Sequence, residues 1–157
     1  MSSAPASTFI YVTYIRTTPE KLWAALTDPK TIKQYWFGCT CESDFKKGSP
    51  WKLIMEDGRL ADTGEILDVD PGKRLVIKWR NEWKPGLKEE GYSTCTMELE
   101  PVEASVKLTI THTIDKKDSK LIEAVSGGWP KVLSNLKSLM ETGGLAMLQP
   151  YKPSSAA

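Results

Sequence analysis

The feature that most constrains the fold of this chain is an amphipathic segment near its C-terminus, residues 118–141. Apolar residues recur in it at steps of three and four, which places them on one face of an α-helix: Leu121, Val125, Trp129, Val132, Leu136 and Leu139. Most of the preceding chain has the composition of β-strands. A long helix with one apolar face needs a sheet against which to bury it. The segment therefore predicts a sheet curved around the helix, with a space between them where a function could reside.

The first half of this predicted helix contains two glycines and a proline, in the sequence Gly127-Gly128-Trp129-Pro130. An interior proline removes one backbone hydrogen bond and usually kinks a helix. The segment is therefore either one kinked helix or a short helix at 119–126 followed by a second that begins at Trp129, and we favour the kink. The glycines would allow a strand or a ligand to approach closely, or they only relieve crowding.

The rest of the chain is predicted from strand composition and turn signals. Residues 9–16 read as a strand, and two short helices at 19–27 and 29–37 follow, each opened by a capping residue and a proline. Six further strands are predicted, at 39–45, 50–56, 59–69, 73–83, 91–101 and 104–114. Short turns join them, so neighbouring strands are antiparallel. Alternation of apolar and polar side chains indicates one covered face, and the predicted class is α+β.

Composition sets limits on the class of protein. The chain of 157 residues suits one domain, predicted at 9–145, with a disordered N-terminus at 1–8 and a flexible tail at 146–157. A net charge of +1 gives no electrostatic reason to expect binding to nucleic acid or an anionic membrane. Three cysteines and one histidine argue for a reducing compartment and against a disulfide scaffold or a metal site. With no signal peptide or membrane-spanning run apparent, we expect a cytoplasmic protein without a cofactor.

Six tryptophans are the strongest sign of a binding cavity, because bulky residues line the space inside a curved sheet but seldom fill it. The residues predicted to line this cavity are Trp36, Trp51, Leu53, Met55, Trp79, Met97, His112, Trp129 and Leu133. Ordinary core packing is the alternative for each of them. His112 could serve as an acid or base, but no nucleophile or carboxylate pairs with it, so no catalytic residue is assigned. Asp57, Asp62 and Asp68 fall on a hairpin and are expected to be exposed.

Four motifs in order resemble one known family. They are TPEKLWAALTDP at 18–29 with Trp-Phe-Gly at 36–38 behind it, the Gly64–Pro71 run, the Leu108–Thr113 strand, and the Gly128–Lys137 helix. Together they resemble the domain named after the activator of the ninety-kDa heat-shock protein ATPase, within the START-like (SRPBCC), birch-pollen-allergen-like superfamily. The resemblance covers most of the chain. It implies a helix-grip fold, with a curved antiparallel sheet of six to seven strands around the C-terminal helix and two short helices after the first strand.

The resemblance implies several functions, because the superfamily includes lipid carriers, hormone receptors, aromatic polyketide cyclases and chaperone regulators. The leading hypothesis is binding of a small hydrophobic molecule, aromatic or lipid-like, in the cavity between sheet and helix. One alternative is a chaperone regulator linked to the stress response, although the separate N-terminal domain of the eukaryotic activator has no counterpart here. Another is an enzyme of the cyclase/aromatase type, but binding without catalysis is favoured. The chain is expected to be a monomer or a homodimer.

Overall fold

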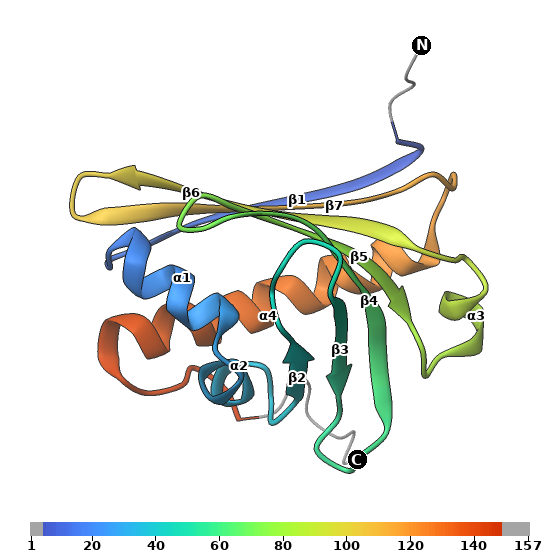
Figure 1. Ribbon diagram of the computed structural model, residues 1–157, viewed down its shortest axis with the longest axis horizontal. Helices are drawn as coiled ribbons and strands as arrows, with labels where there is room; N and C mark the ends of the chain where they lie inside the picture. Colours follow the sequence, from blue (N-terminus) through green and yellow to red (C-terminus); the bar gives the residue numbers. More distant parts are fainter. Residues whose placement is uncertain (1–4, 149–157) are drawn as a thin grey trace.

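The computed structural model describes residues 5–148, which form a seven-stranded antiparallel sheet curved around one long helix (Figure 1). The elements in chain order are β1 (Ser7–Ile15), α1 (Pro19–Thr27), α2 (Pro29–Tyr35), β2 (Thr40–Ser43), β3 (Pro50–Ile54), β4 (Leu60–Asp70), β5 (Arg74–Asn81), α3 (Pro85–Lys88), β6 (Ser93–Val102), β7 (Ser105–Ile114) and α4 (Lys120–Thr142). The strands lie in the order β1-β7-β6-β5-β4-β3-β2. The predicted α+β class and helix-grip architecture are confirmed.

The long helix α4 is continuous from Lys120 to Thr142, with Pro130 in its interior, so the alternative of two separate helices is wrong. Ser119 caps its start, where the side-chain oxygen accepts a hydrogen bond from the backbone N–H of Ile122 at 3.1 Å. Gly143 ends the helix in the left-handed conformation, with φ of 82°, and donates its N–H to the carbonyl of Leu139. Glycine adopts this conformation without steric penalty, which is why the sequence marks this end clearly.

The ends of the chain differ in detail from the expectation. Strand β1 begins at Ser7, two residues before the predicted start, and the Ser7 hydroxyl donates to the carbonyl of Lys116 at 2.6 Å. At the other end, Met147 is tied to the buried side chain of Asn135, which accepts from the Met147 N–H at 2.8 Å and donates to its carbonyl at 2.9 Å. Residues 1–4 and 149–157, which hold much of the predicted disordered N-terminus and flexible tail, lie outside the described residues.

The hydrophobic core lies between the concave face of the sheet and α4. Alternate residues of β5, β6 and β7 point into it, and the second half of α4 contributes Val132, Leu133 and Leu136. Helices α1 and α2 lie at one end of the α4–sheet interface (Figure 1). The first half of α4 lies toward the opposite end, where α3 joins β5 to β6. At this end the space between α4 and the sheet is not filled by side chains.

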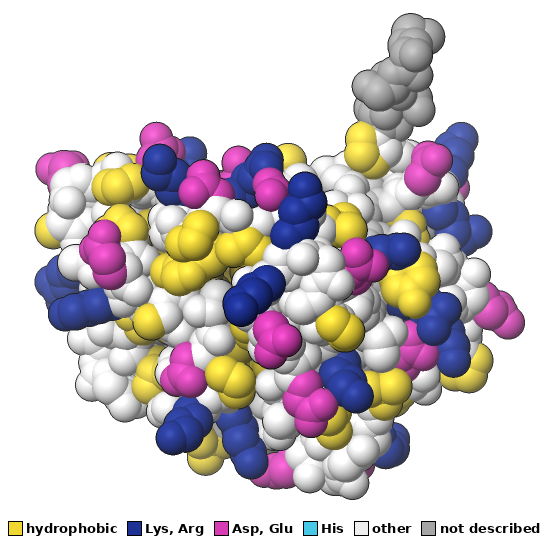
Figure 2. All heavy atoms as spheres, viewed as in Figure 1, with side chains coloured by type: hydrophobic (Ala, Val, Ile, Leu, Met, Phe, Trp, Pro, Cys, Tyr) yellow, Lys and Arg dark blue, Asp and Glu magenta, His cyan; other side chains and the backbone are white. Residues whose placement is uncertain are grey.

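The surface has no dominant charge on the face shown in Figure 2, where acidic and basic side chains are interspersed. Within residues 5–148, no helix combines the length and the apolar content required to cross a membrane.

Candidate functional site

A cleft of about 590 Å³ opens between the first half of α4 and the end of the sheet formed by β3, β4 and β5. Four segments border it: the turn after α2, the β3–β4 hairpin, the end of β5 with α3, and α4. Its walls are mostly apolar, and the apolar residues that line it are Trp36, Phe37, Met55, Ala61, Trp79, Trp83, Leu87, Leu121, Ala124, Val125 and Val132. Clefts of this size and character hold small organic molecules in other proteins.

On the helix side, the cleft is bordered by two residues without side chains, Gly127 and Gly128. A Cβ atom added to either glycine would meet no heavy atom within 4 Å. Packing inside the protein therefore does not require glycine at either position. Each glycine in a helix interior costs about 1 kcal/mol relative to alanine. The pair keeps this side of the cleft wide at the expense of helix stability.

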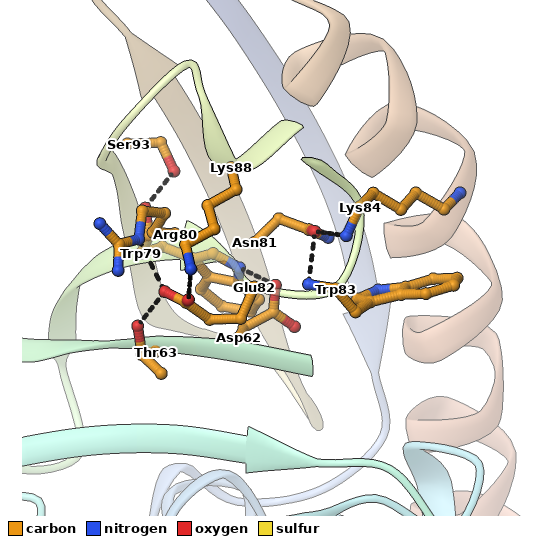
Figure 3. Close-up of polar contacts among 10 residues, drawn as sticks. All are labelled: Asp62, Thr63, Trp79, Arg80, Asn81, Glu82, Trp83, Lys84, Lys88 and Ser93. Atoms are coloured by element: carbon orange, nitrogen blue, oxygen red, sulfur yellow. Dashed lines mark hydrogen bonds and ion pairs between the residues drawn. The ribbon is translucent and has the colours of Figure 1, made fainter. Parts of the chain in front are cut away.

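Asp62 is a carboxyl group in the cleft wall with one oxygen free (Figure 3). Its Oδ1 accepts a hydrogen bond from Nε1 of Trp79 at 3.0 Å, whereas Oδ2 accepts none from any described residue. Burial raises the pKa of Asp62 to about 7, against the opposing effect of the Trp79 hydrogen bond, and the negative charge of Glu82 raises it further. The carboxyl therefore titrates near neutral pH.

The expectation that Asp62 is exposed is wrong, because Asp62 lies opposite the buried residues Leu53 and Asn81 and so shares the inner face of the sheet with them. Leu53 pairs with Asp62, but the next residue, Ile54, pairs with Leu60, so Ala61 is an extra residue on β4. This bulge turns Ala61 inward as well, so both Ala61 and Asp62 line the cleft. Asp57, in the turn of the same hairpin, is exposed as predicted.

The neighbouring carboxyl of Glu82 has the opposite character, because it is surrounded by donors. It accepts hydrogen bonds from Thr63 Oγ1 and Arg80 Nε, both at 2.6 Å, and pairs with Lys88 Nζ at 3.2 Å (Figure 3). Burial alone would raise the pKa of Glu82, but these three donors outweigh it and hold the pKa at about 2. Glu82 is therefore ionised at neutral pH and fixes the strand end beside the cleft, while Asp62 keeps a free oxygen.

Two polar side chains hold the segment between β5 and β6 in place. Asn81 Oδ1 accepts from the backbone N–H groups of Trp83 at 3.2 Å and Lys84 at 2.9 Å, which fixes the turn that places Trp83 at the cleft mouth. Glu90 accepts from the Ser119 hydroxyl at 2.5 Å and from the Lys120 N–H at 2.8 Å, both at the start of α4. Carboxylates are stabilised at this end of a helix by the helix dipole. Glu90 thereby connects the α3 segment to α4.

The rim of the cleft is charged. Glu56, Arg59, Lys84 and Lys131 line it. Arg59 pairs with Asp57 at 2.8 Å, and its guanidinium carbon lies 5.6 Å from the centre of the Trp83 ring. The Lys84 Nζ atom lies 4.8 Å from the same ring. Trp83 is therefore a half-exposed aromatic surface with two cations against it.

Beside the cleft, four tryptophans and His112 form a continuous aromatic cluster within the core. Trp79 is at its centre, with ring centres 4.4 Å from Trp51, 5.7 Å from Trp129 and 6.0 Å from Trp36. The His112 ring centre lies 5.3 Å from that of Trp79. These side chains largely fill the concave face of the sheet, which confines the open space to the α3 end.

His112 is fully buried and held neutral by its hydrogen bonds. Nε1 of Trp129 donates to His112 Nδ1 at 3.1 Å, and since an indole nitrogen only donates, Nδ1 carries no proton. The other ring nitrogen, Nε2, then donates to Ser93 Oγ at 2.7 Å, and this hydroxyl donates to the Trp79 carbonyl at 3.1 Å. Burial lowers the pKa of His112 to about 4. The side chain does not line the cleft, and its contacts are those of a structural residue.

The structure places the nine predicted cavity residues in three groups. Trp36, Met55 and Trp79 line the cleft. Trp51, Leu53 and Met97, together with Trp36, surround a separate void of about 20 Å³, which has room for about one water molecule. His112, Trp129 and Leu133 are buried in the core and line neither space. Contact of any of the nine with a ligand stays a prediction.

Comparison with known proteins identifies the group to which this architecture is similar. The family model described as "Activator of Hsp90 ATPase homolog 1-like protein" matches residues 16–141. A solved structure from Mesorhizobium loti has a TM-score of 0.76 at 24% identity, covering 88% of this chain and 100% of that chain. An HSP90 activator from Plasmodium falciparum has a TM-score of 0.69 at 26% identity, covering 84% and 94%. An Aha1 dimer from Colwellia psychrerythraea has a TM-score of 0.72 at 20% identity, covering 87% and 98%. No curated protein matches the chain.

Proposed function

Since the chain belongs to the family of Activator of Hsp90 ATPase homolog 1-like proteins, we propose that it uses the helix-grip fold of that family to bind a small hydrophobic molecule in the cleft beside α4. The observation that carries this proposal is the cleft itself, with about 590 Å³ of space and mostly apolar walls. The aromatic rings of Trp36, Trp79 and Trp83 favour a flat aromatic or lipid-like ligand body, because they offer broad apolar contact surfaces.

The glycine pair on α4 supports the same proposal. Gly127 and Gly128 together cost the helix about 2 kcal/mol relative to alanine, and no neighbouring atom within the described structure needs the space that their missing side chains leave. Residues that lower stability without a packing reason are typical of positions selected for function. A ligand in the cleft supplies that reason.

The experiment that tests this proposal is a binding screen on the whole chain with a matched pair of helix variants. Aromatic and aliphatic compounds are screened by intrinsic tryptophan fluorescence and by thermal shift. For compounds that bind, Gly127→Phe is expected to reduce affinity about tenfold or more, because the new ring occupies the cleft. Glu123→Phe places the same ring on the same helix at an exposed position that does not line the cleft, and it is expected to bind as the unmodified chain does.

Two results would remove the proposal. One is a broad panel in which no compound changes the fluorescence or the melting temperature. The other is a Gly127→Phe variant that remains folded by circular dichroism and binds as tightly as the unmodified chain.

The second candidate function is regulation of a chaperone ATPase, which the family match and the similarity to the Plasmodium falciparum HSP90 activator favour. It is tested by measuring the ATPase rate of purified Hsp90 with and without this chain. A regulatory role through the outer surface predicts that Gly127→Phe stimulates as well as the unmodified chain does. An unchanged ATPase rate together with no association in a pull-down would contradict it.

A further inference from the structure

The free oxygen of Asp62 gives the cleft a chemical preference beyond its apolar character. We propose that the cleft selects hydrophobic amines, with the ammonium group of the ligand paired with Oδ2 of Asp62 and its apolar body against the aromatic walls. This inference rests on the proposed binding function and narrows the class of ligand.

Asp62 lacks the partners that the other shielded carboxylates have. Glu82 is bound by two basic side chains and a hydroxyl, and Glu90 accepts from a hydroxyl and two backbone N–H groups. Asp62 accepts one hydrogen bond, from an uncharged indole, and no described cation forms an ion pair with it. A carboxylate withdrawn from water is costly unless a cation or several donors compensate it. A ligand cation could reach Oδ2 from the side of Asp62 that faces the cleft.

The aromatic walls favour the same kind of ligand. The face of an indole ring carries negative potential and attracts cations within about 6 Å. Trp83 already shows this property, since the guanidinium of Arg59 and the ammonium of Lys84 both lie against it. An ammonium group beside Asp62 would combine the charge of the carboxylate with the attraction of the Trp36 and Trp79 rings that line the same space.

The titratable groups around Asp62 indicate a negative inner cleft and a basic rim. Burial, together with the charges of Asp62 and Glu56, raises the pKa of the Cys39 thiol to about 11, so this group stays uncharged. Glu82, on the β5 side, is ionised. The rim cations have interactions of their own: Arg59 pairs with Asp57, Lys84 lies against Trp83, and Lys131 of α4 also has an interaction.

The pH dependence of affinity distinguishes an ammonium group paired with ionised Asp62 from a neutral ligand bound to protonated Asp62. An ammonium group binds the ionised form of Asp62, so affinity rises as pH increases through about 7 and then levels off. A neutral ligand that accepts a hydrogen bond from the protonated carboxyl would instead bind more weakly as pH rises. The direction of the change therefore identifies which group on the ligand faces Asp62.

The test compares naphthylethylamine with naphthylethanol, which share one aromatic body, by titration calorimetry at about pH 6 and about pH 8. The amine is expected to bind about tenfold or more tightly than the alcohol at the higher pH. Asp62→Asn keeps an oxygen for the Trp79 N–H but cannot ionise, and it is expected to remove this preference for the amine. Glu65→Gln removes one charge from an exposed position on the same strand and is the matched control.

Equal binding of the two probes, amine affinity that falls with pH, or an Asp62→Asn variant that keeps the preference would each overturn the inference. So would a screen in which other hydrophobic compounds bind the cleft but the amine does not. If no hydrophobic compound binds at all, the proposed function fails as well, and the two failures are thereby distinguished.

Discussion

Replacing Asp62 by asparagine should stabilise this protein, and the gain should depend on pH in a predictable direction. The substitution preserves the shape of the side chain and its acceptor for Trp79 Nε1. It removes the one property that is unfavourable in this position, which is the ability to ionise. The prediction concerns folding only, so it can be tested without knowledge of the ligand.

The magnitude follows from the difference in pKa between the unfolded and folded chains. The pKa of Asp62 rises from an ordinary value of 3.8 to about 7 on folding, mainly because burial disfavours the charge. Between these values the folded state binds more protons at Asp62 than the unfolded state does. The contribution of Asp62 to stability is therefore greatest below pH 3.8 and falls as pH rises to about 7. The pKa difference of about three units, at about 1.4 kcal/mol per unit, limits the stability gain of Asp62→Asn to about 4 kcal/mol. Because Oδ2 faces open space in the cleft, we expect about 2–4 kcal/mol.

The assay is urea unfolding of the unmodified chain and Asp62→Asn at several pH values between about 4 and 8. The difference in unfolding free energy should be small near pH 4 and increase to its full value by about pH 8. His112 has the opposite dependence: its lowered pKa makes stability fall as pH drops below about 6.5 towards 4. Both proteins contain His112, so its contribution cancels in the difference. A difference that does not change with pH would refute the assignment of a shielded, uncompensated carboxyl.

Three further substitutions test the core that supports the cleft, each by urea unfolding. Leu136→Ala removes a fully buried side chain of α4 and should cost about 2–5 kcal/mol, so a loss below 1 kcal/mol would contradict its place in the core. Trp129→Phe leaves His112 Nδ1 buried without a donor and should cost about 1–3 kcal/mol, whereas an unchanged stability would show that this hydrogen bond is not formed. Gly64→Ala would place a Cβ atom 1.5 Å from the carbonyl oxygen of Lys78, so β4 and β5 must separate and a loss of more than about 4 kcal/mol is expected. A well-folded alanine variant would mean that this strand pair is wider than described.

Much of the fold could be predicted from the sequence because its signals are local and repeated. The three-and-four spacing in α4, the proline-opened helices α1 and α2, and the alternation along β5 and β7 each report one element without reference to the rest. Gly143 marks the C-terminal end of α4 by its backbone conformation. The interior proline was less informative, since it allows both a continuous and a divided helix.

The candidate site was harder to predict because it depends on contacts between distant segments. Asp62 lies on the inner face of β4 in phase with Ile66, but a carboxyl group is ordinarily assigned to the exposed side of a strand. The bulge that also turns Ala61 into the cleft cannot be recognised from alternation. The sequence marks tryptophans as bulky but does not show that Trp51 and Trp129 pack against Trp79 and fill the concave face, whereas Trp83 stays half-exposed at the mouth. The glycine pair in α4, recognised as a place of possible close approach by a ligand, borders the open space, as do Trp36, Met55 and Trp79 among the predicted cavity residues.

The segment between β5 and β6, which contains α3, is held mainly at its two ends and can therefore move between them. Asn81 holds one end of this segment to the sheet and Glu90 holds the other to α4, while the residues between them are largely exposed. Segments with few buried contacts open locally at a small fraction of the free energy of global unfolding. Residues 83–89 can therefore open locally, which would widen the cleft that Trp83 and Leu87 line, while the sheet and the second half of α4 stay folded. Such local opening is a much faster event than unfolding of the domain.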